Sequence, residues 1–146
     1  MRLPMNITGI SNREIKMEQM DGRLFQRLSY EIARKVKGKV IGWYPPGYPL
    51  NYFRVDMEKG KNIVSILLHE YYPYVATAAY KNELQIGFLD LEDIFEVLRP
   101  YYIVLETSFL NEPFDPTAHD LTQIEIVNAK YWRPKTNGEV IFNCWD

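Results

Sequence analysis

The sequence is poor in the residues that most often bind metals, with one cysteine, Cys144, and two histidines, His69 and His119. A single cysteine cannot form an internal disulfide, so the composition gives no sign of an oxidising compartment. The three residues lack the spacing of a closed zinc site, and His69 lacks the second histidine of the zinc-protease helix. We therefore expect no metal site, and we expect Cys144 to pack as a small hydrophobic residue rather than to act as a nucleophile.

The chain also lacks a glycine loop that could cradle a phosphate, because Gly38, Gly42 and Gly47 follow neither the dinucleotide nor the nucleoside-triphosphate spacing. Its longest uncharged apolar run, 63–68, falls far short of the ~20 residues that a membrane helix requires. Residues 1–6 lack the apolar core of a signal peptide. These absences predict a cytoplasmic protein without a membrane segment and without a cofactor.

What the sequence does contain is enough apolar material for one folded domain. Of its 146 residues, 47% are hydrophobic and 14% are aromatic, which argues against disorder. A chain of this length buries about 68–70% of the surface that its unfolded form exposes, so it needs no metal or disulfide to fold. We expect a single domain over 1–146, in which 1–17 form an arm or an edge strand.

The stretch from Asn51 to Phe88 predicts an antiparallel meander of four strands. Strict alternation of apolar and polar residues, as in 53–57 and 84–88, is typical of half-buried strands. The run 63–70 is almost continuously apolar, as expected of a strand that is covered on both faces. This strand should therefore lie near the centre of the sheet.

Two helices are expected on either side of the meander in sequence. Over 18–37, apolar residues recur at spacings of three and four opposite a basic face, and Gly38 is well placed to end the helix. After the meander, Asp90 is expected to cap a helix that runs to Pro100. The predicted fold class is therefore α+β: a single mostly antiparallel sheet, with an N-terminal amphipathic helix and one or two later helices packed on it.

The segments beyond these elements carry weaker patterns. Short β-rich runs at 40–44 and 101–105 predict additional strands, whereas 108–119 contains two prolines and predicts a loop. Alternation over 124–132 favours another strand. In the last segment, 134–146, Thr and Glu have capping-box spacing, which favours a short helix over the competing hairpin.

His69 and His119 form the pair that most readily suggests catalysis. Two imidazoles on opposite sides of a phosphodiester can act as general base and general acid in metal-free RNA cleavage. An alternative function is therefore a small metal-free hydrolase or RNase. The structural interpretation, which we favour, makes His69 a half-exposed strand residue and places His119 in a loop or cap pair with Asp120.

The net charge of −2 conceals a strong asymmetry along the chain. Residues 1–39 hold nine basic and four acidic residues, whereas 83–125 hold ten acidic residues and only Arg99 as a base. Such an acidic region repels nucleic acid and favours a basic protein as partner, although a solvated helix face gives the same pattern. The carboxylates that we expect to contact the partner are Asp90, Glu92, Asp93, Glu96, Glu112, Asp115 and Asp120.

The proline-rich segment 43–49 is the best aromatic candidate for a contact, through Trp43, Tyr44 and Tyr48. The interpretation that we favour is that it folds its rings over the end of the sheet. Two rival functions also depend on aromatic residues. One is a small-ligand or regulatory domain whose pocket is lined by Trp43 and the tyrosines of 71–74, and the other is a homo-oligomer that buries the 43–49 segment against itself.

Two features, the acidic region 83–125 and the closing stretch 131–146, give the chain a general similarity to small bacterial immunity proteins. It resembles these toxin-neutralising proteins in character, without a shared motif. The resemblance implies a protein that does not catalyse a reaction but occludes a basic toxin domain, such as a nuclease. In that case, carboxylates would pair with the toxin's Lys and Arg side chains, and aromatic anchors would fill its substrate groove.

Overall fold

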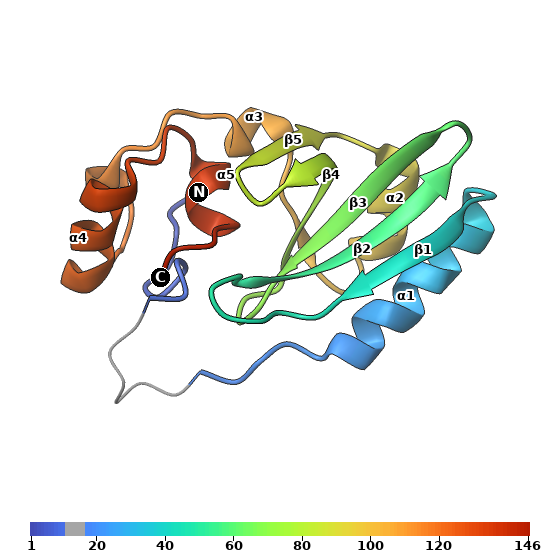
Figure 1. Ribbon diagram of the computed structural model, residues 1–146, viewed down its shortest axis with the longest axis horizontal. Helices are drawn as coiled ribbons and strands as arrows, with labels where there is room; N and C mark the ends of the chain where they lie inside the picture. Colours follow the sequence, from blue (N-terminus) through green and yellow to red (C-terminus); the bar gives the residue numbers. More distant parts are fainter. Residues whose placement is uncertain (11–16) are drawn as a thin grey trace.

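The computed structural model describes residues 1–10 and 17–146, and it shows one twisted sheet with helices on both faces (Figure 1). Five strands form an antiparallel path in the order β1-β2-β3-β4-β5, and a short sixth strand pairs with β4 in parallel. The strands are β1 (Lys39–Tyr44), β2 (Tyr52–Lys59), β3 (Asn62–His69), β4 (Tyr74–Asn82), β5 (Gln85–Leu89) and β6 (Ile103–Val104). The predicted α+β class with one mostly antiparallel sheet is confirmed.

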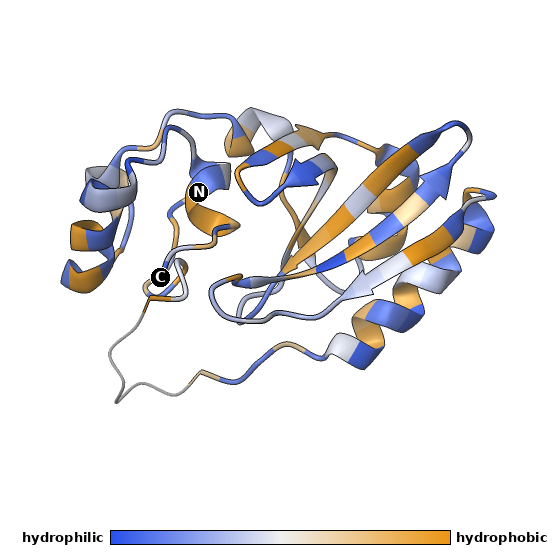
Figure 2. Ribbon diagram, in the orientation of Figure 1, coloured by the Kyte–Doolittle hydropathy of each residue, from blue (hydrophilic) through white to orange (hydrophobic). Residues whose placement is uncertain are grey.

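The alternation in the sequence separates the two faces of the sheet. On β2, Phe53 and Val55 enter one hydrophobic cluster, whereas the neighbouring Tyr52 enters the other. On β3, Ile66 and Leu67 likewise belong to different clusters, which explains why this strand is apolar at successive positions. Figure 2 shows the resulting run of hydrophobic residues along β3 at the middle of the sheet.

One face of the sheet is covered by α1 (Gly22–Lys35) and α2 (Glu92–Leu98). The first helix begins at Gly22 rather than at residue 18, because the Asp21 carboxylate caps it by accepting from the backbone N–H groups of Arg23 and Leu24. The helix ends near Gly38, whose N–H donates to Ala33 O at 2.7 Å. A Cβ at Gly38 would lie 2.4 Å from a backbone oxygen of β2, so this turn requires glycine.

The other face is covered by the N-terminal residues and by two helices, α3 (Thr107–Leu110) and α5 (Asn137–Ile141). A third helix, α4 (Gln123–Trp132), lies beyond them at the end of the molecule and adds Ala129 to the same hydrophobic cluster (Figure 1). Residues 1–10 form turns that bury Leu3 and Ile7, while 11–16 of the expected arm lie outside the described residues. None of the helices in the described residues is long and apolar enough to cross a membrane.

Two predictions for the second half of the chain are wrong. Residues 124–132 form α4 instead of a strand, because Thr122 and Glu125 make a complete capping box that starts a helix. The predicted loop 108–119 begins inside α3 and contains a 3-10 turn, η1 (Pro116–Ala118).

At the C-terminus, the short helix that we favoured is present as α5, and Thr136 caps it by accepting from the N–H of Glu139 at 3.3 Å. The hairpin alternative is therefore excluded. Inside this helix, a Cβ at Gly138 would lie 2.4 Å from the ring of Phe88 on β5, so the absence of a side chain lets α5 pack closely on the sheet.

Candidate functional site

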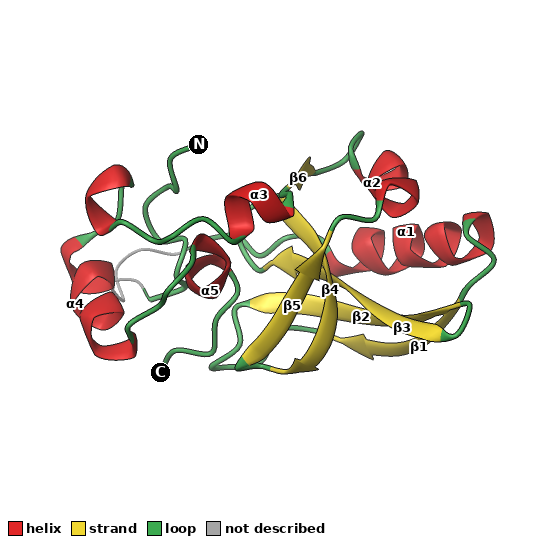
Figure 3. Cartoon of the chain, turned by 90° about the horizontal axis from the view of Figure 1, so that it is seen from above, coloured by secondary structure: helices red, strands yellow, loops and turns green. Residues whose placement is uncertain are grey.

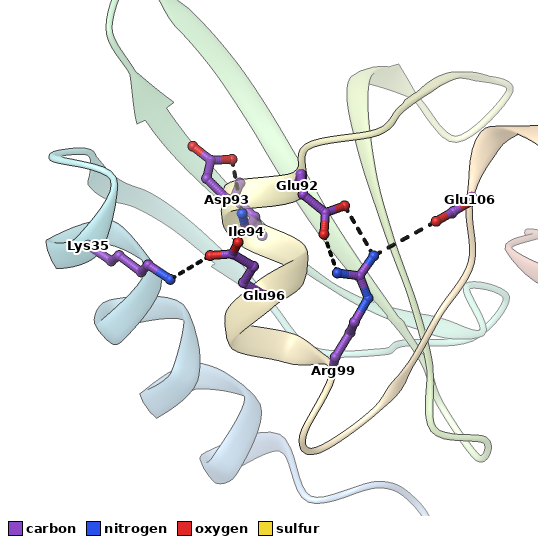
Figure 4. Close-up of polar contacts among 7 residues, drawn as sticks. All are labelled: Lys35, Glu92, Asp93, Ile94, Glu96, Arg99 and Glu106. Atoms are coloured by element: carbon purple, nitrogen blue, oxygen red, sulfur yellow. Dashed lines mark hydrogen bonds and ion pairs between the residues drawn. The ribbon is translucent and has the colours of Figure 1, made fainter.

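Of the acidic residues predicted on α2, Glu92 and Glu96 are exposed and Asp93 is partly exposed. Each pairs with a basic side chain, and Figure 4 shows the pairs of Glu92 and Glu96. Lys35 on α1 lies 3.0 Å from Glu96, and Lys59 on β2 lies 2.8 Å from Asp93. Arg99, just after the helix, donates from its two terminal guanidinium nitrogens to the two carboxylate oxygens of Glu92. The acidic surface of the sequence is therefore partly neutralised in the folded protein.

Two of these ion pairs favour the charged form of their carboxylate. The hydrogen bond from Arg99 lowers the pKa of Glu92, and the hydrogen bond from Lys59 lowers the pKa of Asp93. Exposed ion pairs of this kind contribute little to stability, because solvent screens the charges and ordering two long side chains costs entropy. The pairs can consequently open and exchange their partners at little cost to the fold.

Asp90 does not cap α2, contrary to the prediction. Leu91 occupies the cap position, and the Asp90 carboxylate instead accepts from the N–H and the hydroxyl of Thr107, at 2.9 and 2.8 Å. This contact ties the end of β5 to the start of α3. This structural role is sufficient to explain the presence of an aspartate at position 90.

The remaining predicted carboxylates lie apart from α2. Figures 1 and 3 show the chain running from α2 at one end of the molecule to α4 at the other. In this second region Asp115 caps η1 through Thr117, and Asp120 pairs with Arg2 at 2.7 Å. Glu112 is exposed in the same segment. The ten acidic residues of 83–125 thus do not form one continuous surface.

The three aromatic candidates of 43–49 differ in how exposed they are. The ring centre of Trp43 lies 6.0 Å from those of Phe25 and Phe53, under α1, so this side chain is partly buried against the core. Tyr44 is half exposed and lies 4.1 Å from the Arg54 guanidinium, whereas Tyr48 is 83% exposed. Only Tyr48 is freely available for a contact.

The pocket proposed for Trp43 and three tyrosines is not formed. Tyr72 and Tyr74 stack on each other with ring centres 5.6 Å apart. Both belong to the cluster on the opposite face of the sheet from Trp43.

The sequence analysis did not identify two exposed apolar residues near α2 as candidates for a contact. Tyr101 is 49% exposed and Ile103 is 50% exposed, while Tyr102 between them is buried. Arg99, which pairs with Glu92, also lies 3.8 Å from Glu106, so its guanidinium group lies between the two carboxylates (Figure 4). In sequence, Glu92 precedes the segment 101–103 and Glu106 follows it. The alternation in Tyr101-Tyr102-Ile103 was the available signal, and we interpreted it only as a strand.

His69 is completely buried, not half exposed as predicted. Its Nε2 lies 2.6 Å from Ile7 O, and its Nδ1 accepts from the N–H groups of Tyr71 and Tyr72. This pattern requires the neutral ring with the proton on Nε2. Burial lowers the pKa of His69 to about 4. A general base needs a nitrogen that faces substrate, and His69 has both nitrogens occupied in the core.

His119 occupies a separate position. Its Nδ1 accepts from the N–H of Leu3 at 3.0 Å, and its ring stacks on Phe114 with a centre-to-centre distance of 5.8 Å. Burial lowers the pKa of His119. Each imidazole thus anchors a different point of the N-terminal segment, His69 at Ile7 and His119 at Leu3.

Among the described residues there is no group of three His, Cys, Asp or Glu side chains that could hold a metal ion. Cys144 is partly exposed rather than buried. Burial and the nearby carboxylates of Glu83 and Asp146 raise the pKa of its thiol, which disfavours the nucleophilic thiolate at neutral pH.

No family model, curated protein or solved structure matches this chain. The resemblance to immunity proteins therefore stays a prediction, and any functional assignment depends on the geometry described above.

Proposed function

We propose that the protein is a non-enzymatic binding module that docks a basic protein partner on the surface formed by α2 and residues 99–106. The observation that carries the proposal is the exposure of Tyr101 and Ile103 in a segment that has Glu92 and Glu106 on either side. Exposed aromatic and aliphatic side chains bordered by charged groups are typical of the centre and rim of protein interfaces.

The ion pairs of this surface suit a docking function. Lys35 and Arg99 hold their carboxylates in exposed positions, with side chains 44–63% exposed. A basic partner could replace these intramolecular bases, because the pairs contribute little to folding. The carboxylates would steer the partner during approach, and Tyr101 and Ile103 would supply the apolar contact once it has arrived.

An inhibitor of the immunity type is the form of this function that the resemblance favours. The partner would then be a toxin domain with a basic substrate groove, and the bound protein would block that groove. The Lys and Arg residues that a nuclease uses to neutralise phosphates are complementary to the carboxylates of α2 and to Glu106.

The proposal is tested with Tyr101→Ala and Glu106→Lys, measured by the kinetics of binding to a basic protein isolated by affinity capture from the source cells. We expect Tyr101→Ala to weaken binding by about 30-fold through faster dissociation, since anchor residues contribute about 2 kcal/mol. Glu106→Lys should slow association about tenfold at low salt, with a smaller effect at high salt.

Glu31→Lys is the matched control, because Glu31 is exposed on α1 and its reversal changes the net charge by the same amount. Reversal of Asp93 or Glu96 is less informative, because their bases lie closer, with Lys59 at 2.8 Å and Lys35 at 3.0 Å, than Arg99 lies to Glu106, at 3.8 Å. Binding rates that are equal for wild type and both test variants would contradict the proposal.

A further inference from the structure

A pocket of about 350 Å³ lies between the β4–β5 hairpin and the C-terminal segment, well away from α2. Its lining residues come from three regions that are distant in sequence: 83–88 of the β4–β5 hairpin and β5, Asn111 after α3, and 132–145. The volume is in the range of pockets that bind small metabolites. Its aromatic lining residues are Phe88, Trp132, Phe142 and Trp145.

Contacts made by the lining residues hold the walls of this pocket in place. Phe88 and Phe142 pack with ring centres 5.9 Å apart, and Gly138 lets α5 approach Phe88. Asn143 is buried, and its side-chain amide donates to Thr8 O at 3.0 Å and accepts from the N–H of Trp145 at 3.0 Å. The pocket is therefore largely formed before any ligand arrives, which reduces the entropy lost on binding.

The charged side chains that line the pocket are acidic. Glu83 and Glu139 contribute carboxylates, and no Lys, Arg or His side chain is among the lining residues. Burial is the main cause of the raised pKa of the Cys144 thiol, which also lines the pocket, and the nearby carboxylates of Glu83 and Asp146 raise it further. An anionic ligand would be repelled here, whereas a cation would be attracted.

The aromatic side chains favour the same class of ligand. The face of a tryptophan ring attracts organic cations, and the attraction adds to that of nearby carboxylates when water is partly excluded. Trp132 and Trp145 are the two tryptophans that line the pocket.

From this combination we propose that the pocket binds a free small organic cation: an amine or quaternary ammonium compound with an apolar body. The ammonium group would lie near Glu83 and Glu139, and the apolar body against the rings of Phe88 and Phe142. This site is separate from the surface of α2, and it does not depend on the function proposed for that surface.

The three tryptophans of the chain provide a direct test. Trp132 and Trp145 line the pocket, whereas Trp43 lies under α1. Indole N–H resonances of the ¹⁵N-labelled full chain are recorded during titration with tyramine, choline and agmatine. We expect at least one of these amines to shift the signals of Trp132 and Trp145 at concentrations below about 10 mM, and to leave that of Trp43 in place.

A matched ligand series separates charge from shape. Tyrosol carries a hydroxyl in place of the ammonium of tyramine, and phloretate carries a carboxylate. If tyramine binds, tyrosol should bind about tenfold more weakly and phloretate should not bind measurably, because the lining carboxylates act only on charge. Glu83→Gln should weaken binding of the cation about fivefold, and Glu31→Gln on α1 is the control that should change nothing.

Several results would overturn this proposal. The first is the absence of any shift with all three amines, and the second is binding of tyrosol as tight as that of tyramine. A third is a response from an acetylated, amidated Lys or Arg peptide when the free amines give none. That result would assign the pocket to a protein side chain instead of a free cation.

Discussion

Replacing Glu125 with glutamine is expected to lower the free energy of unfolding by about 3 kcal/mol, because several charge-assisted hydrogen bonds are lost in the core. The Glu125 side chain is fully buried, and its two oxygens accept from four donors. These donors are the N–H groups of Asn6, Thr8 and Thr122 and the hydroxyl of Thr8, at 2.6–3.1 Å. Glutamine keeps one acceptor oxygen but turns an amide N–H₂ toward donors.

The measurement is equilibrium unfolding in urea at neutral pH, with Glu112→Gln as the matched control. Glu112 is exposed, so its substitution should change stability by less than about 0.5 kcal/mol. A loss below about 1 kcal/mol in Glu125→Gln would show that the N-terminal segment is not held by this carboxylate. The difference matters because the segment covers one face of the sheet with Leu3 and Ile7.

Acidification from about pH 7 to about pH 5 is expected to cost about 2 kcal/mol of stability through His69 alone. The pKa of His69 is about 4 in the folded protein, compared with an ordinary value of 6.5. The unfolded chain therefore takes up the proton first as the pH falls. The stabilisation is complete above the ordinary value, decreases below it, and is exhausted once the pH passes the folded-state pKa.

The test compares urea unfolding of wild type and His69→Asn across this pH range. Asparagine can accept from the N–H groups of Tyr71 and Tyr72 in place of Nδ1, so the variant should fold, with lower stability and a flatter pH dependence. His119, whose pKa is also lowered, contributes equally to both proteins and cancels in the difference. Parallel pH profiles of the two proteins would contradict the assignment of this dependence to His69.

The sheet was predictable because its signals are local. Alternation over 53–57 and the apolar run of 63–70 each report the faces of one strand, and strand pairing by short turns follows from chain order. The helix α4 was missed although its capping box was present in Thr122 and Glu125. The alternation of Ile124 and Ile126 was given more weight, and Glu125 was counted as a surface charge.

The candidate sites were less predictable because their contacts join distant parts of the chain. Lys35 and Glu96 are 61 residues apart, and His69 and Ile7 are 62 residues apart. No local pattern indicates that such residues will meet. The pocket was not predictable for the same reason, since its lining joins residues 83–88, Asn111 and residues 132–145.

The sequence by itself determined the α+β class, the order of the central strands and the excess of carboxylates after residue 82. These follow from periodicity and composition, which act over a few residues at a time. The tertiary structure alone decided which charges are paired, which histidine is buried and neutral, and where aromatic rings and carboxylates enclose a pocket. Those outcomes depend on desolvation and on contacts between faces of the fold, and both arise only when the chain is packed.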